Sequence, residues 1–210
     1  MANTNLKMVA YDKIKKMIIE GELEGGSPIQ ELKLVDVIGV SRTPIREACN
    51  LLQHEHLVEI YPKQGVFVTR ISYKDVIDIY SVRIELESYA VEIATKKMNQ
   101  SVKEDLYEKW LKLDQVESFP EHIINDKDLH SKIAKSTTNK YLIQYLERLY
   151  DQTDRIRYYS LNKSESRLQQ TQTEHLRMLQ NMVKGNAKDA NLAMREHLIR
   201  ARDTALQFFE

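Results

Sequence analysis

The chain has 210 residues, of which 42% are hydrophobic and 30% are charged, so it has the composition of a water-soluble protein with one large or two small domains. Its 31 basic and 31 acidic residues cancel, so any nucleic-acid surface must come from a local pattern. No apolar run approaches the roughly 18 residues of a membrane span, and the first residues do not resemble a secretory signal. We therefore expect a cytoplasmic protein without membrane contact, in which the single cysteine, Cys49, stays reduced.

The first 55 residues predict three helices. Apolar residues at helical spacing place the first over residues 5–21, and a Gly-Gly-Ser-Pro cluster then separates it from a second over about 30–37. Ser41 can cap a third helix that runs to about residue 53, because Pro44 is tolerated only in a first turn. Two helices joined by a short turn containing glycine make a helix-turn-helix motif.

A hairpin follows the third helix. Residues 57–61 and 66–69 read as two short strands around a turn that ends in Gly65, which is typical of a wing. Lys63 and Gln64 lie at its tip, where they could contact the DNA backbone or the minor groove. The N-terminal 71 residues are therefore predicted to form a winged helix-turn-helix domain.

Helical periodicity dominates from Ser72 to the end of the chain and predicts six helices. Ser72 and Ser101 each stand three residues before an acid, which favours helix starts at both serines. The fold class is thus mainly α, with a winged helix-turn-helix domain over residues 1–71 and an all-α helical bundle over residues 72–210.

The third helix offers a surface suited to the major groove. Arg42 and Arg46 are four residues apart and share a face with Ser41 and Thr43, while the opposite face is apolar. Arginine can pair with guanine through two hydrogen bonds, and a helix N-terminus favours a phosphate. Two arginines alone would more often form a solvated helix face. The interpretation of this helix as a DNA-reading element therefore depends on the order of the surrounding elements.

This order resembles the GntR family of bacterial regulators. The similarity rests on Gly-Glu-Leu at 21–23, on the run Gly-Val-Ser-Arg-Thr-Pro-Ile-Arg-Glu-Ala at 39–48, on Leu57-Val58 and on Gly-Val-Phe-Val at 65–68. The resemblance implies a homodimer on a pseudo-palindromic DNA operator. The predicted DNA-binding residues are Ser41, Arg42, Thr43, Pro44, Arg46, Lys63, Gln64 and Gly65. Some members carry an arginine where this chain has Leu32, which puts a base contact from the second helix in doubt.

Three of the six histidines fall on separate predicted helices of the C-terminal domain. Asp126 and His130 are four residues apart on one helix, and the turn at 185–186 folds the helices of His175 and His197 antiparallel. One carboxylate and three imidazoles suit zinc, nickel, iron, cobalt or manganese, with positions open for water or an anion. Spacing alone leaves open that these histidines are structural or solvated.

The C-terminal domain also resembles the FCD domain of the FadR subfamily of GntR regulators, and its six predicted helices favour the smaller, VanR-like variant. This resemblance implies that Asp126, His130, His175 and His197 bind a divalent transition metal, with zinc or nickel favoured. It also places Arg83 near the carboxylate of a small organic acid effector; the alternative for Arg83 is a surface ion pair with Glu87.

The expected function is therefore a transcription regulator, with a repressor favoured over an activator, whose operator affinity depends on that acid. Two other functions are weighed against it. A direct metal sensor would respond to the metal itself, and a metalloenzyme would use the metal to activate water. An enzyme is disfavoured because it would not need the Ser-Arg-Thr-Pro-Ile-Arg helix at 41–46.

Overall fold

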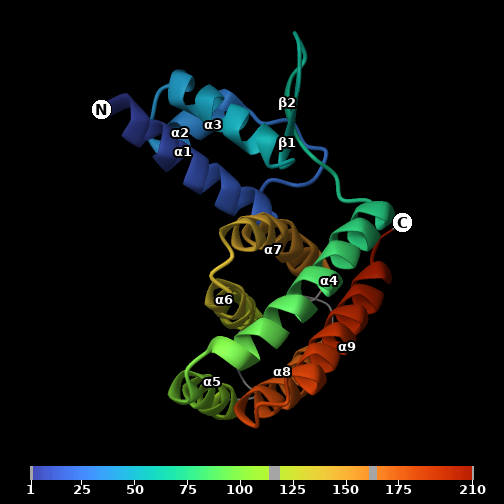
Figure 1. Ribbon diagram of the computed structural model, residues 1–210. Coiled ribbons are helices and arrows are strands. Elements are labelled where there is room, and N and C mark those ends of the chain that lie inside the picture. Colours follow the sequence, from blue (N-terminus) through green and yellow to red (C-terminus); the bar gives the residue numbers. More distant parts are fainter. Residues whose placement is uncertain (1, 114–118, 161–164, 210) are drawn as a thin grey trace. The chain divides into compact units, whose positions relative to one another are not determined.

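A computed structural model describes residues 2–113, 119–160 and 165–209 of the chain. The chain divides into two compact units between Ile71 and Ser72, and each has its own core. Figure 1 shows the course of the elements within each unit. In the part of the chain that the structure describes, no helix combines the length and apolar character needed to cross a bilayer.

The N-terminal unit contains three helices followed by a β-hairpin, as the sequence predicts. Their bounds are α1 Ala2–Ile19, α2 Glu31–Ile38, α3 Arg42–His54, β1 Val58–Tyr61 and β2 Gly65–Val68. The strands are antiparallel, with Val58 opposite Val68 and Tyr61 opposite Gly65. Apolar side chains from all three helices and from both strands form one core.

The turn between α2 and α3 requires a glycine. Gly39 has a φ of 78° and donates its backbone N–H to the carbonyl of Val35 at 2.9 Å, which closes the C-terminus of α2. A side chain in this left-handed conformation would be strained. Only Val40 and Ser41 separate this glycine from the first residue of α3, Arg42, which makes the short turn of the helix-turn-helix motif.

The C-terminal unit consists of helices, and the structure places six of them within its described residues, the number predicted. Their bounds are α4 Tyr73–Lys97, α5 Gln100–Lys112, α6 Phe119–Ser136, α7 Lys140–Ser160, α8 Glu165–Val183 and α9 Ala187–Leu206. The predicted capping box at Ser72 and Asp75 is confirmed. The predicted start at Ser101 is wrong, because Asn99 precedes the helix and Ser101 lies inside its first turn.

Helix α4 is the central element of this unit. It packs against α9, α6 and α7, and Figure 1 shows it running alongside α9. A left-handed Gly185, with a φ of 76°, joins α8 to α9, which also pack together. Besides its apolar core, the interior of the bundle contains many buried charged and polar side chains. Most of these polar side chains belong to one cluster, around Asp126 and the three buried histidines His130, His175 and His197.

Candidate functional site

The N-terminal turn of α3 presents the polar surface that the sequence predicts. Ser41, Arg42, Thr43 and Arg46 are exposed, whereas the opposite side of the helix is buried in the core. Pro44 is also buried, so its inclusion among the predicted DNA-binding residues is not supported by its position. A ring packed in the core has no surface to offer a base or a phosphate.

Two local features shape this surface. Arg46 donates from Nε to both carboxylate oxygens of Glu31 on α2, at 2.8 and 3.0 Å, which holds the guanidinium at the helix surface. Ser41 occupies the N-cap position of α3, but its side chain makes no capping hydrogen bond, contrary to the expected role. The first N–H groups of α3 therefore lack a side-chain cap, and a phosphate would satisfy them.

The hairpin turn carries the other predicted DNA-binding residues. Lys63, Gln64 and Gly65 are all exposed at the end of the two strands. Lys63 and Gly65 both have positive φ values, of 65° and 116°, so the turn is tight. Lys63 and Gln64 lie at the tip of a wing whose two strands pair at four positions.

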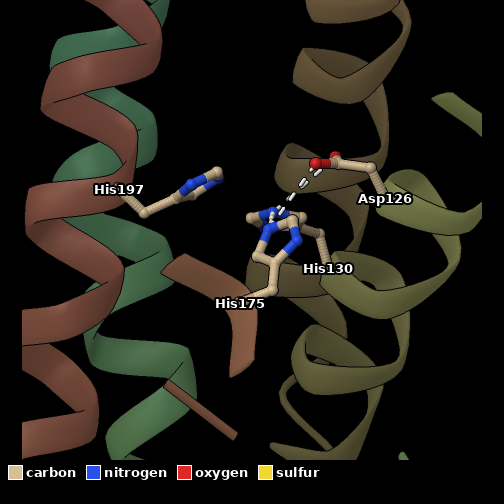
Figure 2. A group of neighbouring side chains, drawn as sticks. All are labelled: Asp126, His130, His175 and His197. Carbon is tan, nitrogen blue, oxygen red and sulfur yellow. Dashed lines mark hydrogen bonds and ion pairs between the residues drawn. The ribbon is translucent and has the colours of Figure 1, made fainter. Parts of the chain in front are cut away.

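In the C-terminal unit, the structure brings together the four predicted metal ligands. Asp126 and His130 come from α6, His175 from α8 and His197 from α9, and Figure 2 shows their side chains converging. One ligand atom from each lies within 4.8 Å of the others, and all four side chains are buried. His130 and His175 place their Nε2 atoms 3.3 Å apart, and Nε2 of His175 lies 3.6 Å from Oδ1 of Asp126.

A buried carboxylate orients His130. Nδ1 of His130 pairs with Oε2 of Glu87 on α4, which leaves Nε2 directed at the cluster. Glu87 accepts in turn from Nε of Arg83 at 2.6 Å and from the hydroxyl of Tyr150 at 3.3 Å. Burial by itself would raise the pKa of Glu87, but Arg83 and His130 lower it to about 2, so Glu87 is an anion.

The ion pair of Arg83 with Glu87 is therefore a buried one, and the surface ion pair offered as the alternative for Arg83 is wrong. The Arg83 guanidinium lies over the rings of Tyr80 and Tyr150, and its Nη1 and Nη2 atoms are buried with no hydrogen-bond partner among the described residues. Buried guanidinium nitrogens are costly to leave unpaired.

A second carboxylate orients His197 in the same way. Nδ1 of His197 pairs with Oε2 of Glu174 at 2.8 Å, and Arg167 binds both oxygens of Glu174, each at 2.8 Å. Burial by itself would raise the pKa of Glu174, but His197 and Arg167 lower it to about 2. Metal-binding histidines commonly donate their other ring N–H to a carboxylate, which raises their basicity and fixes their orientation.

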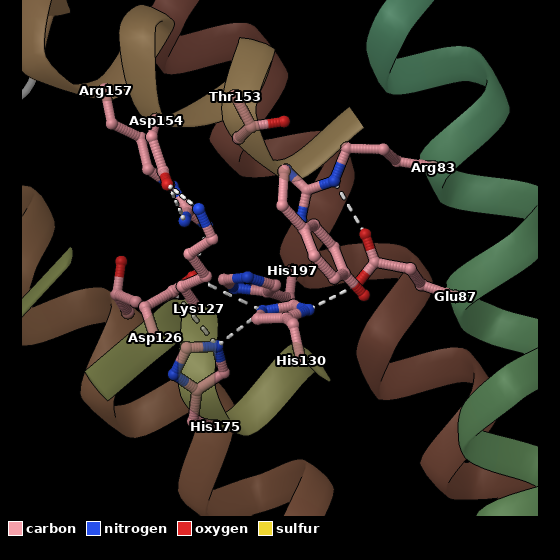
Figure 3. A network of polar contacts seen from close by, with 12 residues as sticks. Arg83, Glu87, Asp126, Lys127, His130, Thr153, Asp154, Arg157, His175 and His197 are labelled. Carbon is pink, nitrogen blue, oxygen red and sulfur yellow. Dashed lines mark hydrogen bonds and ion pairs between the residues drawn. The ribbon is translucent and has the colours of Figure 1, made fainter. Parts of the chain in front are cut away.

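The remaining two members of the cluster have different neighbours. The ring of His175 packs edge-on against Trp110 with centroids 4.4 Å apart, so α5 supports its position. Asp126 pairs with Arg157 on α7, and Arg157 also lies 3.5 Å from Asp154 (Figure 3). Burial by itself would raise the pKa of Asp126, but Arg157 and the histidines lower it well below its usual range.

The protonation states suit a metal. Burial lowers the pKa of His197 to about 4 and that of His175 well below its usual range, so both imidazoles are neutral near pH 7. Nε2 of His197 is buried and has no hydrogen-bond partner within the described part of the chain. A buried lone pair beside two other imidazoles and a carboxylate is suited to coordinate a cation. The donor set therefore fits a divalent transition metal.

A cleft leads to this cluster. It is small and partly open to solvent, and Asp126 and His197 form part of its wall. Arg157 and Arg167 line it as well, whereas Arg83 does not. A small molecule in the cleft would thus meet two of the four predicted metal ligands first.

Sequence reasoning missed the supporting residues of this site: Glu87 as a partner of His130, Glu174, Arg157, Arg167 and His122. His122 precedes Asp126 by four residues, so it lies on the same side of α6 and lines the cleft. That spacing was visible in the sequence. The role of Glu174 was not visible in the sequence, because a glutamate next to a histidine can equally well be buried beside the site or exposed to solvent.

Comparison with known proteins decides the family. The family model for the FCD domain matches residues 78–200, and that for bacterial regulatory proteins of the gntR family matches residues 6–68. The chain belongs to the GntR family. It is thus a DNA-binding transcription regulator with a C-terminal FCD domain, and its relatives are transcription regulators rather than enzymes.

Several relatives of this GntR regulator match along most of its length. YdhC of Bacillus subtilis strain 168, an uncharacterised HTH-type transcriptional regulator, is 29% identical and covers 89% of this chain and 85% of its own. The transcriptional repressor GlaR of Escherichia coli K12 is 25% identical over 90% of both chains. The gluconate operon transcriptional repressor of Bacillus subtilis is 28% identical over 67% of this chain and 58% of its own.

Solved structures show the same fold. A GntR transcriptional regulator from Rhodococcus sp. RHA1 superposes with a TM-score of 0.83 at 19% identity, covering 99% of this chain and 100% of its own. McbR/YncC of Escherichia coli superposes with a TM-score of 0.80 at 21% identity, covering 96% and 97%. The winged-helix and helical-bundle architecture is therefore shared at low sequence identity.

Proposed function

We propose that this GntR regulator is a repressor whose affinity for its operator is controlled by a small organic acid bound at a metal ion in the FCD domain. The observation that carries the proposal is the convergence of Asp126, His130, His175 and His197 in a buried cluster, with two of the imidazoles held by carboxylates. Relatives whose names describe them as repressors support the sign of regulation.

The proposed DNA contacts come from α3 and from the wing. The exposed residues of the predicted set are Ser41, Arg42, Thr43, Arg46, Lys63, Gln64 and Gly65. Two copies of the chain would place one α3 in each half of a pseudo-palindromic operator. A single small module binds DNA weakly at physiological salt, which favours a homodimer.

The proposed metal is zinc or nickel, bound through Nε2 of the three histidines and a carboxylate oxygen of Asp126. Ligand atoms about 2.1 Å from one ion lie at most roughly 4.2 Å apart, so the cluster, whose ligand atoms lie within 4.8 Å of one another, must contract by at least about 0.6 Å to bind one ion. A bound ion would supply positive charge and open coordination positions for an anion. Four protein ligands leave such positions open in an octahedral arrangement.

Arg83 stays our candidate for a second contact to the carboxylate of the acid. Its Nη1 and Nη2 atoms have no hydrogen-bond partner among the described residues and can donate hydrogen bonds to a carboxylate. Glu87, with which Arg83 pairs, also holds His130. Helix α4 carries both residues and begins at Tyr73, immediately after the winged-helix unit. A shift of α4 on ligand binding would therefore act directly on the segment that joins the two units.

Metal analysis of the purified wild type and of a His175→Ala, His197→Ala double variant tests this function, alongside binding to a DNA site selected in vitro. We expect near-stoichiometric metal in the wild type, loss of it in the double variant, and an acid that changes DNA affinity in the wild type only. His54→Ala, at an exposed histidine outside the cluster, is the control for metal content.

Metal-free wild type with intact DNA binding would overturn the metal-anchored mechanism and leave the regulator assignment standing. DNA affinity that follows the metal concentration without any acid would identify a direct metal sensor instead.

A further inference from the structure

We propose that Leu32 recognises a thymine of the DNA operator through the 5-methyl group of that base, close to the base pair that Arg46 reads. The proposal rests on the proposed function, because it requires that α3 contacts DNA through Arg46. It comes from two features of the winged-helix unit: the ion pair that joins the start of α2 to α3, and the exposed leucine that follows this ion pair in the sequence.

The ion pair places the start of α2 beside the guanidinium of Arg46. Glu31, the first residue of α2, accepts hydrogen bonds from Nε of Arg46 at 2.8 and 3.0 Å. Both of these bonds use Nε, so the hydrogens on Nη1 and Nη2 can be donated to another acceptor. Two guanidinium nitrogens can donate together to O6 and N7 of a guanine. A base pair that Arg46 reads in the major groove therefore also lies near the first turn of α2.

Leu32 follows Glu31 directly and has an exposed fraction of 61%, although a leucine side chain gains free energy when it is buried. Around the axis of α2 it lies next to the side that faces α3, where Glu31 contacts Arg46 and Val35 packs against the core. A single exposed leucine elsewhere on a protein surface needs no explanation. This one borders the surface that DNA is proposed to cover, so DNA binding would bury it.

The chemistry of leucine limits what it can recognise. Its side chain has no hydrogen-bond donor or acceptor, so it cannot pair with a phosphate oxygen or with the polar edge of a base. The apolar group that base pairs present in the major groove is the 5-methyl group of thymine. Adjacent Cα atoms are about 3.8 Å apart and successive base pairs about 3.4 Å. The thymine should therefore lie within about three base pairs of the one that Arg46 reads.

Replacement of thymine by deoxyuridine tests the proposal, because it removes the methyl group and leaves the base pairing unchanged. The probe is the DNA site selected in vitro, in which one thymine position at a time is replaced in both half-sites. At one position near the base pair read by Arg46, we expect the affinity of the wild type to fall by about three- to fivefold for each half-site, because one methyl group is no longer buried. Fluorescence anisotropy at a fixed salt concentration measures the affinity.

Leu32→Ala identifies the side chain responsible. This variant should bind the unmodified site more weakly than the wild type does, and it should no longer distinguish thymine from deoxyuridine at that position. Val37→Ala is the matched control, because Val37 is an apolar residue of α2 with an exposed fraction of 63%. It lies about 140° around the helix axis from Leu32, so its variant should keep the preference for thymine. Both side chains are exposed, so both variants should fold like the wild type.

Arg46→Ala locates the base pair that Arg46 reads, which is the position where this variant loses the base preference of the wild type. A deoxyuridine effect that stays unchanged in Leu32→Ala would overturn the proposal. So would the absence of any deoxyuridine effect within three base pairs of the located position.

Both of these results leave the proposed function intact as long as Arg46→Ala reduces the affinity for DNA. If Arg46→Ala binds DNA as tightly as the wild type does, the proposed DNA surface on α3 is itself wrong, and the role of Leu32 is overturned with it.

Discussion

Arg46 is held in place by another residue of the winged-helix unit before any DNA arrives. Its Nε bonds both oxygens of Glu31, while 64% of its side chain stays exposed. A guanidinium positioned in this way loses less conformational freedom when it meets a base. The ion pair itself is solvated and contributes little to folding, so its importance lies in orientation.

We expect Arg42→Ala and Arg46→Ala each to reduce affinity for the selected DNA site by about 1 to 3 kcal/mol, which is roughly 5- to 150-fold. Both side chains are exposed, so the variants should unfold like the wild type. Fluorescence anisotropy with labelled DNA measures the loss, and Lys16→Ala on α1, an exposed cation outside the predicted set, is the control. Equal losses in all three variants would indicate only general charge attraction.

Cys49 provides a test of the winged-helix core. Burial raises the pKa of its thiol from 9.0 to about 11, and Glu31 adds to the shift. An unfolded chain would lose this proton at lower pH than the native one, so the thiol's contribution to stability is complete below pH 9 and is lost as the pH rises through 11. The contribution is on the order of 2 to 3 kcal/mol.

The free energy of unfolding of the wild type should therefore fall more steeply between pH 9 and 11 than that of Cys49→Ala. Urea titrations at several pH values give both slopes. Parallel slopes would show that the thiol ionises in the native state as easily as in the unfolded one.

Helices α4 and α8 each orient a histidine that belongs to another helix. Each contributes a buried glutamate that holds a histidine of another helix by its Nδ1: Glu87 on α4 holds His130, and Glu174 on α8 holds His197. The same glutamates neutralise Arg83 and Arg167. His130 and His197, two of the proposed metal ligands, are thus held by packing between helices as well as by their own helices.

Replacing Glu174 with glutamine should weaken zinc binding by about 10- to 100-fold, because the negative charge that polarises His197 is lost while the side chain keeps its shape. Competition with a chromophoric chelator measures the affinity. The control is Glu196→Gln, since Glu196 lies on the neighbouring α9 and pairs with exposed Arg177. An unchanged affinity in Glu174→Gln would mean that His197 does not bind the metal through Nε2.

For the whole molecule, the division into two units has a thermodynamic consequence. The four proposed metal ligands all belong to the unit that begins at Ser72, and the winged helix has a separate hydrophobic core. A ligand stabilises only the unit that binds it. Removing the metal should therefore affect one unfolding transition and spare the other.

Differential scanning calorimetry of the full-length chain with zinc and with a chelator tests this expectation. Free zinc at 100 times its dissociation constant should stabilise the C-terminal unit by about 2.7 kcal/mol, and the His175→Ala, His197→Ala variant should show no such difference. Equal shifts of both transitions would show that the two units unfold together.

The local sequence determined much of this architecture. Helical periodicity, the glycine turn before Ser41 and the hairpin turn at Gly65 predicted the winged helix and the six helices of the second unit, because each signal lies within a few neighbouring residues. The ligand pair Asp126 and His130 was visible for the same reason, since residues four apart share a helix face. The assignment of all four residues as metal ligands came from the resemblance to the FCD domain.

Only the tertiary structure decided which side chains support the site. Glu87 and His130 are 43 residues apart, and nothing in the spacing of either distinguishes a buried pair from a solvated one. The burial of Arg83, which the sequence also allowed as a surface ion pair, follows from α4 packing against α7 and α9. Pro44 turned inward because its helix has one apolar side. Such contacts depend on how the helix faces meet, and a one-dimensional pattern records only which faces exist.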